Sequence, residues 1–311
     1  MRRPLRVALD TTPLLQTRAG TARYVLGLRE HLDVELVEVG FPASSRARTA
    51  AADLLWYPRL RAPAGVDVLH CPTFRGPFRP YGPLVVTVHD LAVLRHPEWF
   101  NAWSGAYSRF AVPRVVRAAS RVIAVSEFTK RELVALLGVS PEKIRVVPNA
   151  VEEVFVPDGP RADGDYVLAV GTLEPRKNLA RIARAVDGEL RVVGARGWRG
   201  VEPPDNVTWL GDVSDEELAR LYRGARCLVY ASLYEGFGIP VAEALACGCR
   251  VVTTRDSAMA EIAGGDAAYV DASDAESIRD GIARAPAVEA RHGPTWPEVA
   301  AVTRTVYEEL L

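Results

Sequence analysis

Apolar and polar residues alternate along the chain in blocks that are typical of buried strands and amphipathic helices. In the first half, short apolar runs predict strands, and the segments between them carry apolar residues at helical spacing. The predicted strands are Leu5–Leu9, Val66–His70, Leu84–Val88, Arg121–Val125 and Ile144–Val147, and the predicted helices are Ala22–Leu32, Ala106–Ala119 and a Ser126-capped segment to Leu137. Continuous apolar strands separated by helices indicate a parallel sheet that is covered on both faces.

A segment rich in Pro, Asp and Gly, Val156–Asp165, interrupts this pattern, and the alternation then begins again. The predicted strands of the second half are Tyr166–Val170, Leu190–Val193, Val207–Leu210, Cys227–Ala231 and Arg250–Thr253, and its predicted helices are Leu179–Val186, Asp215–Arg223 and Pro240–Cys247. We therefore expect two Rossmann-like α/β domains, residues 1–158 and 159–295. A last helix is predicted over residues 296–311, where an apolar stripe consists of Val299, Val302, Val306 and Leu310.

The composition is that of an ordinary globular protein. The chain has 311 residues, of which 49% are hydrophobic and 25% charged, a length that favours two domains. The longest apolar runs are far shorter than the roughly 20 residues that cross a bilayer, and the N-terminal run is too short for a secretory signal. The four cysteines lack zinc-ligand spacing, so we expect reduced thiols and a cytoplasmic protein.

Formal charge is distributed unevenly between the two halves. Residues 1–155 contain seven more basic than acidic residues, and residues 156–311 contain eight more acidic than basic residues. A basic first half suits an anionic partner such as a membrane surface or a lipid phosphate, and dispersed surface charge explains the same count. We expect no nucleic-acid partner.

Residues 232–243 combine two glutamates with a glycine-rich turn between a predicted strand and a predicted helix. Gly236 and Gly238 permit the backbone to approach a ligand closely. Glu235 and Glu243 can accept hydrogen bonds from the vicinal hydroxyls of a ribose or a sugar ring. The same residues also fit a purely structural loop followed by a helix, with Glu243 in the first turn, where a carboxylate complements the helix dipole.

The spacing of Glu235 and Glu243, with seven residues between them, resembles the E-x7-E signature of retaining GT-B glycosyltransferases of family 4, the glycosyl transferases group 1. Other segments resemble landmarks of this family in the same order along the chain, namely Val88–Asp90, Ile123–Ser126, Val147–Asn149 and Val170–Asn178. The resemblance implies a GT-B architecture, in which two facing Rossmann-like domains enclose a cleft and the last helix crosses back to the first domain.

The resemblance also implies roles for individual residues. Arg176 and Lys177 follow a predicted strand, at the edge where open α/β sheets bind ligands, and would stabilise a leaving nucleoside diphosphate. His89 is expected near the reacting carbon of the sugar, and together with Glu235 these residues form the expected catalytic set. The expected donor-binding residues are Gly20, Gly171, Arg176, Lys177, Glu235, Gly236, Phe237, Gly238 and Glu243.

Asp163 and Asp165 form an Asp-x-Asp pair, which holds a metal ion in glycosyltransferases of the other main fold. This pair precedes the predicted strand Tyr166–Val170 and therefore lies at the edge of the sheet opposite to the expected ligand site. We expect a turn there, no metal site, and catalysis without a cofactor.

The resemblance implies a retaining hexosyltransferase that takes its sugar from a nucleotide-diphosphate donor. GDP-mannose ranks ahead of a UDP-sugar, and the acceptor hydroxyl would belong to a saccharide, a lipid-linked compound or a small molecule. Same-face attack without metal is the expected mechanism, and a peripheral contact with the inner face of the membrane is expected. Two alternatives remain: a nucleotide-sugar epimerase of the same fold, and a non-catalytic nucleotide-sugar-binding protein.

Overall fold

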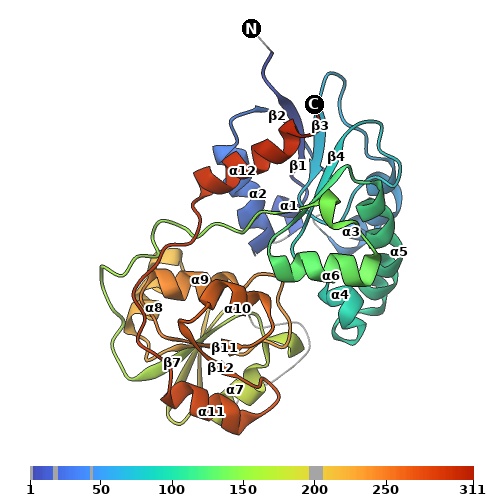
Figure 1. Ribbon diagram of the computed structural model, residues 1–311. Helices are drawn as coiled ribbons and strands as arrows, with labels where there is room; N and C mark the ends of the chain where they lie inside the picture. The colour runs from blue at the N-terminus through green and yellow to red at the C-terminus, as the bar shows by residue number, and fades with distance from the viewer. Residues whose placement is uncertain (1–2, 17–19, 43–44, 196–205) are drawn as a thin grey trace. The chain divides into compact units, whose positions relative to one another are not determined.

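The computed structural model describes residues 3–16, 20–42, 45–195 and 206–311 (Figure 1). The chain divides into two compact units: unit 1 comprises Met1–Ala150 and Pro294–Leu311, and unit 2 comprises Val151–Gly293. Each unit contains a six-stranded sheet, and every strand pairing described in it is parallel. The predicted α/β class and the parallel sheets are therefore confirmed.

The sheet of unit 1 has the strand order β2-β1-β3-β4-β5-β6. Its strands are β1 (Arg6–Asp10), β2 (Glu35–Val39), β3 (Val68–Cys71), β4 (Leu84–Val88), β5 (Arg121–Ala124) and β6 (Ile144–Val146). The sequence pattern does not reveal β2, because this edge strand is partly exposed and carries two glutamates among three apolar residues. The other five strands lie where the apolar runs predict them.

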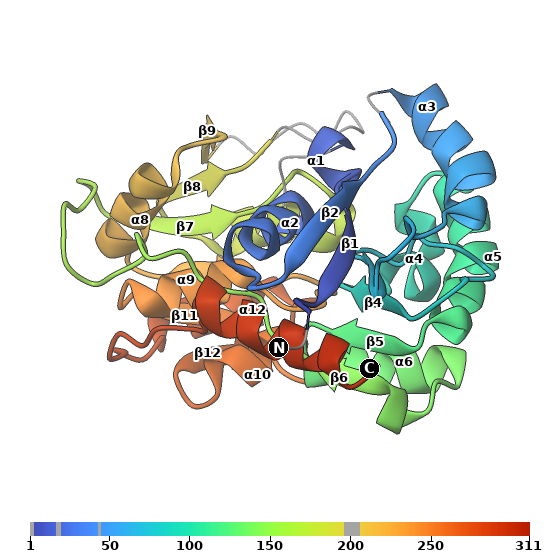
Figure 2. The same ribbon diagram turned by 90° about the horizontal axis from the view of Figure 1, so that it is seen from above.

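Helices cover both faces of the sheet of unit 1. The helical segments are α1 (Pro13–Gln16), α2 (Gly20–His31), α3 (Arg46–Ala51), η1 (Ala52–Trp56), η2 (Tyr57–Arg59), α4 (Ala92–Arg95), η3 (Pro97–Trp99), α5 (Ala102–Ala118), α6 (Glu127–Leu137), η4 (Pro141–Lys143) and α12 (Trp296–Glu308). Buried side chains of α2 and α12 form one core against the sheet, and those of η1, η2, α5 and α6 form the other. Figure 2 shows α2 and α12 near each other in unit 1.

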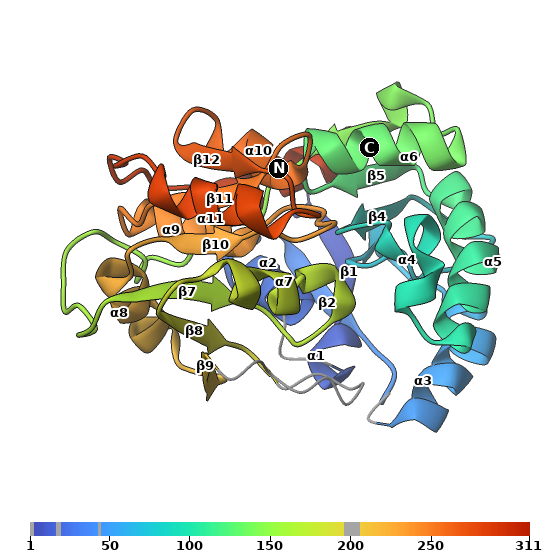
Figure 3. The same cartoon turned by 90° about the horizontal axis from the view of Figure 1, so that it is seen from below.

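The sheet of unit 2 has the strand order β12-β11-β10-β7-β8-β9. Its strands are β7 (Tyr166–Val170), β8 (Glu189–Val193), β9 (Val207–Gly211), β10 (Leu228–Tyr230), β11 (Val251–Thr254) and β12 (Ala267–Val270), and its helical segments are η5 (Pro175–Lys177), α7 (Leu179–Ala185), α8 (Asp215–Gly224), α9 (Ile239–Ala246), α10 (Ala258–Ala263) and α11 (Ala275–Ala283). Helices α8, α9 and α10 pack on one face, and α7 and α11 pack on the other (Figure 3). The pairing of β10 with β7 positions the site described below.

The observed boundary between the units precedes the predicted one at residue 159. The Pro- and Gly-rich segment Val156–Asp165 belongs to unit 2 and is not a linker between the domains, because Ala162 is buried in the core of unit 2 and its amide donates to the carbonyl of Arg220 at 3.0 Å. The chain instead passes between the units at Ala150–Val151 and again at Gly293–Pro294. A loop rich in Pro and Gly looks like a linker in sequence, whereas its apolar residues decide where it packs.

Helix α12 is an integral part of unit 1. The ring of Trp296 lies so close to α2 that a Cβ on Gly27 would overlap its Cδ2 atom. At the other end of the helix, the carboxylate of Glu309 accepts hydrogen bonds from the Nε atoms of Arg121 and Arg145, both at 2.8 Å. The last residues of the chain thereby complete a core that the first 150 residues leave open.

We predict that removal of residues 296–311 destabilises unit 1 more than unit 2. The truncation would expose the surfaces that bury Trp296, Val299, Val306 and Tyr307, each of which contributes about 1.5–3 kcal/mol when buried. Hydrogen exchange should show the largest loss of protection in α2 and β1. Glu309→Gln, which alters only the exposed end of the helix, should change the free energy of unfolding by less than about 1 kcal/mol. Equal loss of protection in β7 and β10 would contradict the prediction.

Candidate functional site

Two loops of unit 2 meet at the carboxyl edge of its sheet. Strands β7 and β10 are parallel neighbours, so the segments that follow them leave the sheet at the same edge. The amide of Leu233 donates to the carbonyl of Arg176 at 2.8 Å, which joins the two loops directly. Residues that stand more than 50 positions apart in sequence are thereby brought into contact.

The carboxylate of Glu235 lies between two cations. Arg176 donates from Nη1 to Glu235 Oε2 at 2.9 Å, and Lys177 donates from Nζ to Glu235 Oε1 at 2.5 Å. The hydroxyl of Tyr230 accepts from Lys177 at 2.7 Å and donates to Glu235 Oε1 at 3.0 Å. Glu174 accepts from Arg176 Nε at 2.9 Å on the outer side of the cluster. The two cations are thus matched by two carboxylates.

Burial and neighbouring charges shift the pKa values of Glu235 and Lys177 in opposite directions. Glu235 is only 7% exposed, although it lies in a loop where the sequence would lead us to expect an exposed side chain. Burial alone would raise the pKa of Glu235, but the charges of Lys177 and Arg176 outweigh it and hold that pKa at about 2. Burial lowers the pKa of Lys177, against the attraction of Glu235. The carboxylate therefore stays ionised between its cations at neutral pH.

Asn178 fixes the shape of the first loop. Its backbone adopts a left-handed conformation with φ of 58°, which asparagine tolerates better than most residues. Its side-chain amide donates to the carbonyls of Ala231 at 3.1 Å and Ala272 at 2.7 Å. Asn178 and Tyr230 are supporting residues to which the sequence assigns no role, although they lie within the segments Val170–Asn178 and Cys227–Ala231 that it identifies.

The glycines of the site permit close backbone approach. Gly171 has φ of 150°, and a Cβ there would stand 3.0 Å from Cδ of Lys177. Gly238 has φ of 105° and precedes α9, where a Cβ would meet Cγ of Met259 at 2.7 Å. Gly236 and Phe237 lie in the same turn, and Phe237 is buried. Side chains larger than hydrogen would displace the loops at Gly171 and Gly238.

Glu243 occupies a different position from the one expected. It is the fifth residue of α9 and lies beyond the first turn, so the expected interaction with the helix dipole is wrong. Its carboxylate is buried and accepts a hydrogen bond from the hydroxyl of Tyr222 in α8 at 2.9 Å. A role of Glu243 in ribose binding stays a prediction.

The remaining expected site residues belong to unit 1. His89 follows β4, and its Nε2 atom lies 3.1 Å from the carbonyl of Pro72. Because a carbonyl only accepts, Nε2 carries the proton and Nδ1 keeps a lone pair; burial lowers the pKa of the imidazole. Gly20 begins α2, and residues 17–19 before it lie outside the described residues.

Asp163 and Asp165 lie at the amino end of β7, on the edge of the sheet opposite to Glu235. Asp165 is exposed and pairs with Arg226 at 3.5 Å, and the carbonyl of Asp163 accepts from Arg191 at 3.0 Å. In the part of the chain that the structure describes, no three His, Cys, Asp or Glu side chains gather as metal ligands would. The four cysteines are buried and form no disulfide.

The structure thus brings Arg176, Lys177 and Glu235 together, and Gly171 lies against the side chain of Lys177. Gly236, Phe237 and Gly238 continue the turn that carries Glu235, whereas Glu243 faces Tyr222. His89 and Gly20 belong to the other unit. The cluster of Arg176, Lys177 and Glu235 lies at the carboxyl edge of the sheet of unit 2, where open α/β sheets bind ligands.

Comparison with known proteins gives this geometry a context. Residues 151–289 match the family model described as Glycosyl transferases group 1, and residues 17–155 match Glycosyltransferase Family 4. O-antigen chain mannosyltransferase B of Escherichia coli is 28% identical, over 79% of this chain and 72% of that protein. O-antigen chain mannosyltransferase RfbU of Salmonella typhimurium is 31% identical, over 63% of this chain and 59% of that protein.

Solved structures show the same fold at low sequence identity. Sucrose-phosphate synthase of Thermosynechococcus elongatus has a TM-score of 0.66 at 17% identity, covering 98% of this chain and 94% of its own. The Anabaena protein HepE, solved with UDP-glucose, has a TM-score of 0.66 at 15% identity, covering 98% and 95%. With two family models that together account for most of both units, the chain belongs to the family 4, group 1 glycosyltransferases and has their GT-B fold.

Proposed function

We propose that this glycosyltransferase moves a hexosyl group from a nucleotide-diphosphate sugar to an acceptor hydroxyl, with retention of configuration and without a metal ion. The observation that carries the proposal is the convergence of Arg176 and Lys177 on Glu235 at the carboxyl edge of β7 and β10. Cations at this edge suit the diphosphate of the donor, and the turn at residues 236–238 suits its sugar.

The cluster favours the charge that develops during the reaction. As the bond from the anomeric carbon to phosphate oxygen breaks, negative charge accumulates on the diphosphate, and Arg176 and Lys177 stabilise it. In the structure described, these cations are balanced by Glu174 and Glu235, so the incoming diphosphate has to share them. Arg176 is more exposed than Lys177 and can turn toward a ligand more easily.

The proposed step is same-face attack. The acceptor oxygen forms its bond to the anomeric carbon on the face from which the diphosphate leaves, and the departing phosphate oxygen takes the hydroxyl proton. His89, held neutral by burial, offers the lone pair of Nδ1 to a hydroxyl at the reacting sugar. The cations of the cluster perform the charge stabilisation for which a divalent ion would otherwise be used, and this supports the metal-free proposal.

The donor is proposed from the relatives. The two curated relatives described above are named as mannosyltransferases, which supports GDP-mannose, and the HepE structure with UDP-glucose supports a UDP-sugar as the second candidate. Epimerisation of a nucleotide sugar and binding without turnover remain the alternatives. Neither alternative has a specific observation of this chain in its favour.

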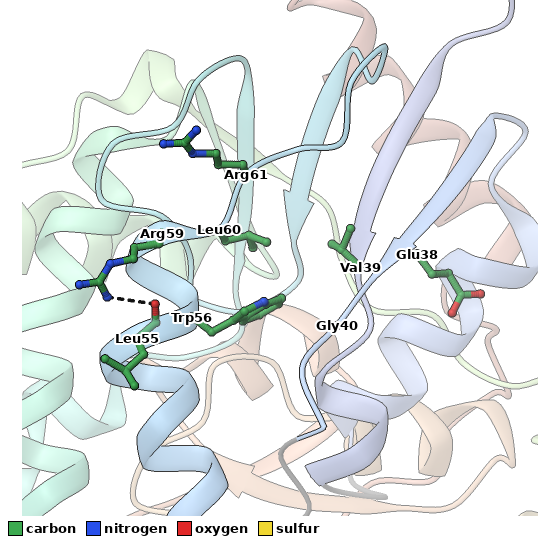
Figure 4. Close-up of a pocket in the computed structure, with 8 residues that line it drawn as sticks. All are labelled: Glu38, Val39, Gly40, Leu55, Trp56, Arg59, Leu60 and Arg61. Atoms are coloured by element: carbon green, nitrogen blue, oxygen red, sulfur yellow. Dashed lines mark hydrogen bonds between the residues drawn. The ribbon is translucent and has the colours of Figure 1, made fainter.

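A pocket of unit 1 is the proposed contact for the acceptor. It opens at the carboxyl end of β2 and is lined by Glu38, Val39, Gly40, Leu55, Trp56, Arg59, Leu60 and Arg61 (Figure 4). The indole of Trp56 is directed toward Gly40, whereas Arg59 turns to the carbonyl of Leu55 at 3.1 Å. The aromatic face of Trp56 suits a sugar, whereas the carboxylate of Glu38 and the guanidinium groups of Arg59 and Arg61 are directed away from it.

Helix α5 supports a peripheral contact with an anionic membrane. Trp103 and Phe110 stand seven positions apart on its outer face and are 44% and 49% exposed, with Arg109 and Arg114 beside them. The guanidinium of Arg114 stacks over the Phe110 ring at 3.7 Å, and α5 contains no acidic residue. Aromatic and basic side chains on one helix face suit an interface with acidic lipids. None of the described helices is both long and apolar enough to span a bilayer.

The function itself is tested by turnover in the presence of EDTA. With GDP-mannose, UDP-glucose and a panel of acceptors, we expect release of nucleoside diphosphate only when an acceptor is present, at a rate that EDTA does not change. NMR of the product should show the anomeric configuration of the donor. Conversion of the donor sugar without acceptor would establish an epimerase, and a strict magnesium or manganese requirement would contradict the metal-free mechanism.

Loss of a cluster charge should act mainly on the chemical step. Lys177→Met is expected to lower kcat by roughly 100-fold or more with a smaller change in KM, because the charge it stabilises is largest in the transition state. Glu235→Gln should also lose most activity, since the two cations lose the group that orients them. Arg226→Met, which removes a cation at the opposite edge of the same sheet, is the matched control and should leave both constants unchanged. Wild-type kinetics in both cluster variants would contradict the assignment.

Membrane contact is tested by co-sedimentation with vesicles of phosphatidylglycerol and of phosphatidylcholine. We expect binding to the anionic vesicles at low salt and its loss at 1 M salt, where the Debye length falls from roughly 10 Å to 3 Å. A Trp103→Ser, Phe110→Ser double variant should lose this binding and keep turnover with a soluble acceptor. Leu210→Ser, at an exposed apolar residue of unit 2, is the control. Failure to bind anionic vesicles at low salt would contradict the proposed contact.

A further inference from the structure

A hydrogen-bonded chain of buried side chains runs through unit 1 from α12 to the neighbourhood of His89. The hydroxyl of Tyr307 lies 2.7 Å from Nδ1 of His70, and Nε2 of His70 lies 2.8 Å from Oγ1 of Thr87. Oγ1 of Thr87 in turn lies 3.0 Å from the hydroxyl of Tyr24 in α2. These four side chains are each at most 1% exposed.

The hydrogen-bonded side chains of Tyr307, His70 and Thr87 have little freedom to rearrange. Burial lowers the pKa of His70 to about 3, so its imidazole is neutral and donates at one nitrogen while it accepts at the other. The single hydroxyl proton of Thr87 serves either His70 or Tyr24. Removal of the Tyr307 hydroxyl leaves Nδ1 of His70 without its partner in this hydrogen-bonded chain, and removal of the Thr87 hydroxyl does the same to Nε2 of His70.

Tyr24 connects this chain to His89. The edge of one ring meets the face of the other at a centroid separation of 4.9 Å and an interplanar angle of 84°. On its other side, Nε2 of His89 lies 3.1 Å from the carbonyl of Pro72. The imidazole is thus confined by one aromatic ring and one hydrogen bond. The tyrosine ring that confines it is anchored by packing and by its hydroxyl, which bonds to Thr87 and also to Thr303 of α12.

We propose that Tyr24 is a positioning residue for His89, and that Tyr307 of the C-terminal helix holds Tyr24 in place through His70 and Thr87. The last helix of the chain thereby sets the orientation of a side chain at the carboxyl end of β4. The catalytic consequence rests on the proposed function, in which Nδ1 of His89 faces a hydroxyl at the reacting sugar.

The kinetic test uses variants that remove one hydroxyl and little volume. Tyr307→Phe, Thr87→Val and Tyr24→Phe should each lower kcat by roughly 10- to 100-fold with KM for the donor within about twofold, because a small misplacement of a reacting group has effects of that size. Tyr107→Phe is the matched control: Tyr107 is a buried tyrosine of unit 1 whose hydroxyl has no hydrogen-bond partner in the structure. Thermal unfolding of every variant defines an assay temperature at which all remain folded.

A spectroscopic arm reports on His89 directly. In the wild-type protein, imidazole ¹⁵N NMR should show His89 protonated at Nε2, and Tyr307→Phe should shift or broaden these signals, whereas Tyr107→Phe should not. A double-mutant cycle completes the test. If Tyr307 acts through His89, Tyr307→Phe should have no further effect on kcat in a His89→Ala background.

The outcomes separate this proposal from the proposed function. Unchanged His89 signals in Tyr307→Phe, or an equal loss of kcat with and without His89, would overturn the positioning role. If His89→Ala keeps wild-type kcat while Tyr307→Phe still perturbs the His89 signals, the positioning role stands and the catalytic role assigned to His89 fails.

Discussion

The buried carboxylate of Glu235 is the constraint on which the site of unit 2 depends. Two adjacent cations at the end of a loop repel each other, and their removal from water is costly unless each has a partner. Glu235 supplies a partner to both Arg176 and Lys177, and Tyr230 closes the cluster beneath them. This arrangement exists only because β7 and β10 are neighbours in the sheet, so the order of the strands is a precondition of the chemistry.

The core of unit 1 depends on contacts made by the C-terminal segment, which returns to this unit after unit 2. Residues 294–311 complete its core, with Trp296 against Gly27 and Tyr307 hydrogen-bonded to His70. A polar chain inside an apolar core is stable only when each member has its partner, so it specifies one arrangement of α2, α12 and the sheet more narrowly than apolar packing does. Stability and the orientation of His89 thereby share the same side chains.

The chemical roles divide between the units according to charge. Unit 2 holds ionised groups at the carboxyl edge of its sheet, where Lys177 and Arg176 keep Glu235 charged. Unit 1 provides a neutral imidazole at His89, since burial lowers its pKa, and an aromatic and basic surface on α5. In the proposed function, the charged donor would meet the ionised groups of unit 2 and the acceptor hydroxyl the residues of unit 1.

The sequence by itself determines most of the strands, because continuous Val, Ile and Leu runs bounded by Gly and Pro have few other structures open to them. It also identifies Arg176, Lys177 and Glu235, whose residue types and spacing are local properties. Only the tertiary structure decides that Glu235 is buried between the cations, that Glu243 meets Tyr222, and that Tyr307 reaches His70. Each of these contacts joins positions at least 21 residues apart, and the edge strand β2 likewise becomes visible only through its pairing with β1. The spacing of apolar residues along the sequence shows which side of a helix or strand is buried. Which side chains it contacts there depends on the order of the strands in the sheet and on the return of the C-terminal helix to unit 1.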